Sequence, residues 1–133
     1  MGLFGKAAIV ATRIVAGGRK LSPGEAWDLA IARLSNSPKT QKKTCPRNAY
    51  LGLCEAGAIV GIEAGRYGAP EDNPNGAYAL TALSLLQSGE AADKQLLWSR
   101  VTAPRRLSPD EQMDVVLSLW EQHLLQSGEP TSA

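Results

Sequence analysis

Prolines, glycines and small polar residues divide this chain into short segments, and in most segments the apolar residues recur every three or four positions. This spacing places the apolar side chains along one face of an α-helix. The clearest helix start is Ser22–Glu25, where a serine, a proline and a glutamate have the spacing of a capping box. Ser108–Glu111 repeats that chemistry in the second half of the chain. The pattern predicts helices over residues 3–16, 23–34, 46–56, 75–87, 92–101 and 108–126.

These segments predict an all-α fold, a single compact domain of five to seven helices that spans residues 1–133. A chain of 133 residues is long enough to bury one core without disulfides or metals. The β-branched run Ala58–Ile62 is either an extended arm or another helical turn, so we expect at most a minor β element near residues 58–67. Residues 128–133 are small and polar and are expected to be a frayed tail. The residues predicted to lie in or near the core are Trp27, Tyr50, Leu53, Leu85, Trp120 and Leu124.

The first predicted helix is amphipathic, with cations on one face and apolar residues on another. Its apolar positions at helical spacing are Leu3, Ala7, Val10 and Ile14. The first 24 residues contain cations and no acid, as transit peptides do, but an amphipathic first helix of the domain accounts for the same pattern. We therefore expect a cytoplasmic protein.

The charge of the chain is unevenly distributed, although the formal net charge is only +1. Residues 1–67 carry ten Lys and Arg against four Asp and Glu, a net +6, whereas residues 68–133 carry four against nine, a net −5. Either the two halves attract each other within the fold, or each faces a different partner. A hydrophobic fraction of 44% argues against a disordered chain, and no apolar run is long enough to predict a membrane span.

Residue types that carry catalysis or bind metals are sparse. Cys45 and Cys54 would lie about 13 Å apart along one helix, too far for a disulfide, so we expect both to be reduced thiols. His123 is the single histidine, and no zinc-ligand spacing, phosphate-binding loop or serine-nucleophile motif occurs in the sequence. The sequence predicts no metal, no cofactor and no enzymatic activity.

The strongest local feature is a basic stretch between the second and third long helices. Four cations and no acid occur within nine residues, at a helix start whose free backbone N–H groups favour anions. We expect its charged side chains to be available outside the core, because burying a charge without a partner costs several kcal/mol, on the order of 3–5. The alternatives are a solvated basic loop or pairing with the acidic half. The candidate partner-binding or anion-binding residues of this basic stretch are Lys39, Lys42, Lys43, Thr44, Arg47 and Asn48.

One segment resembles a known family. The string CPRNAYLGLCEAGAIVGI from Cys45 to Ile62 is similar to the core signature of an uncharacterised family of small bacterial proteins. The stretches Tyr78–Leu80 and MDVVLSLWEQHLL resemble that family as well. The resemblance implies a single domain and a bacterial or phage origin, and it implies no particular activity.

We therefore expect a non-enzymatic protein-interaction module, such as a phage or mobile-element inhibitor that docks on a larger bacterial complex through the basic stretch. The expected partner is an acidic protein surface or a large protein complex, and no membrane. The alternative is a small nucleic-acid-binding regulator of the helix-turn-helix type that uses the helix start at residues 44–48. A recognition helix should display polar residues to base edges, however, and the helix after Pro46 is mostly small and apolar. A small enzyme ranks third.

Overall fold

The computed structural model describes residues 2–90, 93–102 and 111–126, and within these ranges the regular secondary structure is helical apart from one isolated β-bridge. None of the helices in these ranges is long and apolar enough to cross a membrane. The helices are α1 (Leu3–Ala16), α2 (Pro23–Leu34), α3 (Pro38–Gln41), α4 (Thr44–Glu55), α5 (Pro74–Ser88), α6 (Lys94–Thr102) and α7 (Glu111–Glu121). The predicted all-α fold class is confirmed.

Capping chemistry explains where several of these helices begin and end. The predicted capping box of α2 is present: the Ser22 hydroxyl accepts from Glu25 N at 3.2 Å, and Ser22 N donates to Glu25 Oε1 at 3.0 Å. The second predicted box begins at residues 108–110, which lie outside the described residues. At the other ends, Gly57 and Gly89 adopt positive φ after α4 and α5, a conformation that glycine takes without strain.

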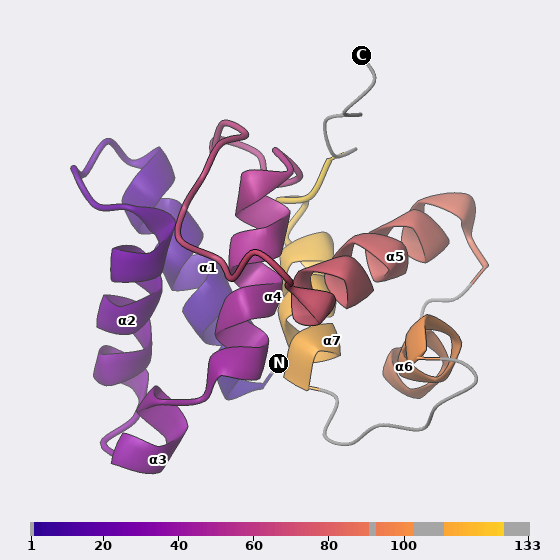
Figure 1. Cartoon of the computed structure of the whole chain (residues 1–133), viewed down its shortest axis with the longest axis horizontal. Coiled ribbons are helices and arrows are strands. Elements are labelled where there is room, and N and C mark those ends of the chain that lie inside the picture. Colours follow the sequence, from indigo (N-terminus) through magenta and orange to yellow (C-terminus); the bar gives the residue numbers. More distant parts are fainter. Residues whose placement is uncertain (1, 91–92, 103–110, 127–133) are drawn as a thin grey trace.

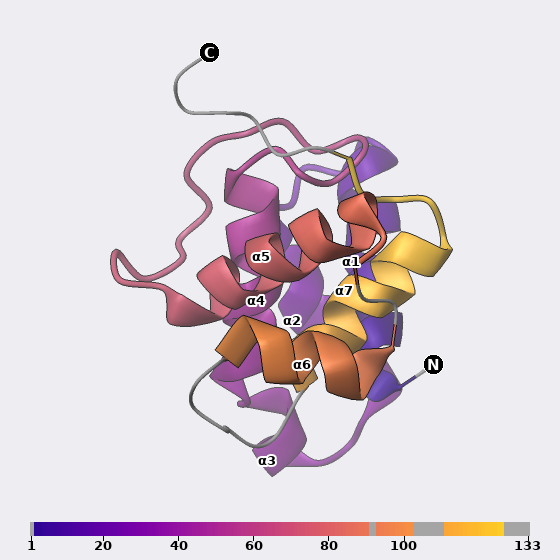
Figure 2. The same ribbon diagram turned by 90° about the vertical axis from the view of Figure 1, so that its right-hand side faces the viewer.

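Helix α4 lies at the centre of the fold (Figure 1), where it packs on α2, α5 and α7. Helices α1 and α2 lie side by side, and α1 also packs on α7. Helix α6 packs on α5 and α7, on the side away from α2 (Figures 1 and 2). One apolar cluster joins these helices. Of the expected core residues, Trp27, Tyr50 and Leu53 are buried. The other three, Leu85, Trp120 and Leu124, are half-buried and pack against that cluster.

Helix α1 turns toward the core a different face from the one its large apolar residues suggest. Its buried residues are Gly5, Ala7, Ala8, Ile9, Ala11 and Thr12. Small residues occupy this face because α7 approaches closely: a Cβ on Gly5 would overlap the Ser118 hydroxyl. Of the predicted apolar positions, only Ala7 is fully buried, and Val10 and Ile14 remain half-buried at the edge of the core.

The minor β element expected near residues 58–67 is a single antiparallel bridge between Ile59 and Leu125. Val60 N donates to Leu124 O, and Gln126 N donates to Ala58 O, each at 2.8 Å. The last helix therefore ends at Glu121 and not near residue 126 as predicted.

His123 is what ends this helix early. Its φ is 58°, and Leu124 N then donates back to Leu119 O, which closes the helix end without a glycine.

The region of the basic stretch is more helical than expected. Residues 38–41 form the single turn α3, whose start is capped by the Ser37 hydroxyl accepting from Thr40 N at 3.2 Å. Helix α4 begins at Thr44, two residues before the predicted start. Pro46 is tolerated there because the N–H groups of a first helical turn have no partner within the helix.

Candidate binding surface

The basic stretch runs through α3 and the first turn of α4. Its residues fall into two groups by exposure. Lys39, Lys42 and Thr44 are exposed. Lys43, Arg47 and Asn48 are half-buried in contacts with other helices, which are described next.

Lys43 is paired with the acidic half of the chain. Its ammonium group donates to Glu111 Oε2 in the first turn of α7, and it lies 5.8 Å from the ring centroid of Phe4. The Lys43 side chain is 37% exposed and that of Glu111 is 18% exposed. Lys43 therefore joins α4 to α7 and is not a free charge.

Arg47 is also paired. Its guanidinium binds Asp28 of α2 through two bonds, Nε to Oδ1 at 2.9 Å and a terminal nitrogen to Oδ2 at 3.2 Å. The fork lies against Gly24, where a Cβ would come within 2.8 Å of Arg47 Nη2. Lys43 and Arg47 thus lie outside the core, and both are paired: Lys43 with an acid of the acidic half, which is one of the alternatives given above, and Arg47 with an acid of its own half of the chain.

Asn48 takes part in the contact between α4 and α5. Its backbone carbonyl accepts from Asn73 Nδ2 at 3.0 Å, and the Asn73 side-chain oxygen caps α5 by accepting from Gly76 N at 3.1 Å. Gly52 faces Gly76 so closely that a Cβ on Gly52 would overlap the Gly76 Cα. The Asn48 carbonyl and the α5 cap therefore fix a close helix crossing.

The acidic half also contacts the start of α1. The Asp114 carboxylate of α7 accepts from Gly2 N at 3.1 Å and from Gly5 N at 3.0 Å. The N-cap residue Gly2 has no side-chain cap of its own, so Asp114 supplies the cap from another helix. Together with the Lys43–Glu111 pair, this contact shows that the two halves of the chain do attract each other at these places.

The remaining cations of the first half have no acidic partner in the part of the chain that the structure describes. Eight of the ten Lys and Arg of residues 1–67 belong to this group, since of these ten only Lys43 and Arg47 form ion pairs among the described residues. These eight are Lys6, Arg13, Arg19, Lys20, Arg33, Lys39, Lys42 and Arg66. All eight are exposed.

Four of these cations surround a hollow along the outer side of α1, which we call the cationic groove. It consists of two adjoining cavities of about 270 and 290 Å³ that share Val10 and Arg13. The lining residues of the two cavities together are Lys6, Ile9, Val10, Arg13, Ile14, Gly17, Arg19, Arg33, Leu34 and Gln122. Among the described residues, no carboxylate lines either cavity.

The cationic groove combines an apolar floor with charged edges. Ile9 is almost fully buried at its base, and Val10, Ile14 and Leu34 are half-buried around it. These side chains offer apolar contact area, and the cations beside them offer charge-assisted hydrogen bonds to an anionic group. The sequence does not single out this site, because its cations are six or more positions apart and come from α1, α2 and the loop between them. The helical spacing of Lys6, Val10, Arg13 and Gly17 is the signal that could have found it.

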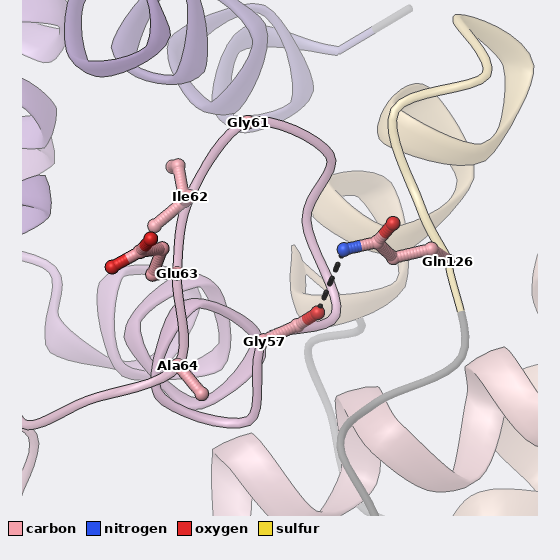
Figure 3. Close-up of a pocket in the computed structure, with 6 residues that line it drawn as sticks. All are labelled: Gly57, Gly61, Ile62, Glu63, Ala64 and Gln126. Carbon is pink, nitrogen blue, oxygen red and sulfur yellow. Dashed lines mark hydrogen bonds between the residues drawn. The ribbon is translucent and has the colours of Figure 1, made fainter.

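A second hollow lies where the 57–64 loop meets the chain after α7 (Figure 3). It has a volume of about 490 Å³ and is lined by Gly57, Gly61, Ile62, Glu63, Ala64 and Gln126. The Gln126 amide spans it by donating to Gly57 O at 3.0 Å. Glu63 is the single ionisable group among its described lining residues, which therefore bring together no acid–base or nucleophilic pair.

The thiols and the buried tyrosine have structural environments. Cys45 is exposed and Cys54 is buried, and both are free. Burial raises the pKa of the Cys54 thiol to about 12, so it stays protonated at neutral pH. Burial also raises the pKa of Tyr50, whose hydroxyl is 2.9 Å from Thr12 Oγ1 of α1. The described residues contain no cluster of His, Cys, Asp and Glu that could hold a metal ion.

These features define a small all-α protein in which eight cations of residues 1–67 have no acidic partner among the described residues. The chain belongs to a family of unknown function, DUF6979, whose model matches residues 1–126. This agrees with the resemblance to an uncharacterised family. Comparisons with curated proteins and with solved structures give no match.

Proposed function

We propose that this protein is a non-enzymatic interaction module that docks on an acidic protein surface of a larger complex. The observation that carries the proposal is the cationic groove, where Lys6, Arg13, Arg19 and Arg33 have no acidic partner among the described residues and surround apolar side chains. Such an arrangement matches a partner that supplies both carboxylates and apolar contact area.

Lys39 and Lys42 of the basic stretch extend this surface. They follow the C-terminal end of α2, where Leu34 lines the cationic groove, and both are exposed. Long-range attraction of an acidic partner depends on the summed field of such charges, and the paired Lys43 and Arg47 add little to it. We therefore assign Lys39 and Lys42 to the rim of the docking surface.

The nucleic-acid alternative keeps some support from the same cations, since phosphates also bind unpaired Lys and Arg. Two features favour a protein partner. Helix α4 is surrounded by α2, α5 and α7, and in its first turn only Thr44 and Cys45 are exposed, so it has no free face to enter a DNA groove. The apolar floor of the cationic groove also has no counterpart in a phosphate backbone.

The proposal is tested by capturing partners with the tagged full-length chain from nuclease-treated lysate of cells that encode it. Arg13→Glu should reduce recovery of the bound protein strongly, because it places an acid where the two cavities of the cationic groove meet. Arg66→Glu makes the same charge change on an exposed loop outside the groove and is the matched control. Lys39→Glu with Lys42→Glu should give a smaller loss, as expected of rim charges.

Either of two outcomes would contradict the proposal. One is a partner that is retained equally by the parent protein and by Arg13→Glu. The other is recovery that disappears on nuclease treatment, with purified protein binding DNA or RNA at an affinity that falls steeply as salt rises.

We also propose that the protein acts in the cytoplasm and inhibits a larger bacterial complex. Two free thiols fit the reducing cytoplasm. A chain of 133 residues that acts by occupying a surface fits an inhibitor of a larger bacterial complex, carried by a phage or mobile element.

A further inference from the structure

We infer that the occupant of the cationic groove is an acidic amphipathic helix of the partner protein, about three turns long. This inference rests on the proposed function and makes it more specific, because it names the shape and the charge pattern of the bound segment.

The length of the cationic groove sets the length of the segment. Its lining residues on α1 run from Lys6 to Gly17, and eleven residues of helix extend for about 16 Å. A partner helix lying along α1 would place about eleven residues, or three turns, over that distance.

The floor of the cationic groove sets the apolar pattern. Val10 lies where the two cavities meet, Leu34 lines the first cavity and Ile14 lines the second. A helix contacts such a row with side chains at positions i, i+3 or i+4, and i+7, which lie on one face. An extended peptide presents alternate side chains on one side, about 7 Å apart, and it binds through backbone hydrogen bonds to the edge of a sheet. The described residues of this fold offer no sheet edge, so a bound helix is favoured over an extended peptide.

The edges of the cationic groove set the charge pattern. Lys6 and Arg13 lie on α1, and Arg33 lies on the neighbouring helix α2. Carboxylates on both flanks of a bound helix would meet these cations, and lysines there would be repelled. The groove therefore selects a helix with one apolar face and acidic flanks over a basic or neutral one.

The inference is tested with synthetic peptides of about 14 residues and the full-length protein, by fluorescence anisotropy. The first probe carries leucines at helical spacing and glutamates elsewhere. The second has the same composition with its leucines spread over all faces of the helix, and the third is polyglutamate of the same length. The first probe should bind at least about tenfold more tightly than the second and third.

Two variants in the groove and one control variant outside it test whether the binding lies in the groove. Arg13→Glu with Arg33→Glu should abolish binding of the first probe, and Arg66→Glu should leave it unchanged. Val10→Thr keeps the shape and charge of the side chain while replacing a methyl group by a hydroxyl, so it should weaken binding of the first probe several-fold and leave polyglutamate binding as it is. Circular dichroism and thermal unfolding check that each variant is folded.

Equal binding of the first and second probes, or a first probe insensitive to Val10→Thr, would overturn the helix assignment. If polyglutamate still binds and is lost in the double charge reversal, the proposed acidic partner stands and only its helical form is refuted. If no acidic probe binds in the groove, both the inference and the proposed function fail. Preferential binding of a single-stranded oligonucleotide would point to the nucleic-acid alternative.

Discussion

Replacing Asp114 with alanine should destabilise the protein substantially, although Asp114 belongs to neither candidate binding region. Its carboxylate supplies the only cap that the start of α1 has within the described residues, through bonds to Gly2 N and Gly5 N. The bond to Gly5 is partly buried, so water replaces it poorly when the carboxylate is removed. Losing an N-cap lowers stability by about 1 kcal/mol, and a hydrogen bond to a charged group contributes about 1.5–3 kcal/mol that is lost with it.

We therefore expect Asp114→Ala to lower the free energy of unfolding by about 2 kcal/mol. For a chain of this size, that corresponds to a fall in Tm of about 8 °C. Asp114→Asn keeps one acceptor oxygen without the charge and should cost about half as much, roughly 1 kcal/mol.

Urea unfolding followed by tryptophan fluorescence, together with thermal unfolding, measures both variants. The matched control is Asp72→Ala, which removes an exposed acid that has no hydrogen bond in the described part of the chain. A Tm for Asp114→Ala within about 1 °C of the parent would refute the trans-capping argument.

Further predictions concern the paired lysine and the two thiols. Lys43→Glu should lower the free energy of unfolding by about 1–2 kcal/mol, because it removes the ion pair and places a second acid beside Glu111. Lys42→Glu, at an exposed position, should change the free energy of unfolding by no more than about 0.5 kcal/mol. Equal effects of the two substitutions in chemical denaturation would contradict the Lys43–Glu111 pairing. A thiol reagent at neutral pH should modify Cys45 in the native protein and reach the buried Cys54 only on unfolding, so mass spectrometry that finds two rapidly modified thiols would show that Cys54 is accessible.

Local sequence signals predicted the helices but not the contacts between them. The capping box at Ser22 and the helix spacing of the apolar residues depend on neighbours a few positions away, so the sequence alone identified them. The chain after α7, which ends at Glu121, pairs with residues 58–60 through the bond from Val60 N to Leu124 O, and these segments lie more than 60 residues apart. The one-turn helix α3 was missed because it is too short for any apolar periodicity.

The same limit explains the outcome for the candidate site. A sequence window shows Lys43 and Arg47 as part of a positive run, because Glu111 and Asp28 lie far from them along the chain. Once those pairs form, the unpaired positive charge lies mainly elsewhere. Arg13 and Arg33 come together only because α1 and α2 pack side by side, and no local sequence pattern predicts that these two residues line the same cavity.

The central claim is that the partner contacts the cationic groove and not the start of α4. Nuclear magnetic resonance of the ¹⁵N-labelled full-length chain, titrated with the acidic amphipathic probe peptide, tests it directly. The proposal predicts that the largest amide shifts cluster at residues 6–17 and 33–34, with smaller shifts at Lys39 and Lys42. Shifts centred on residues 43–48, or spread evenly over the surface, would contradict it.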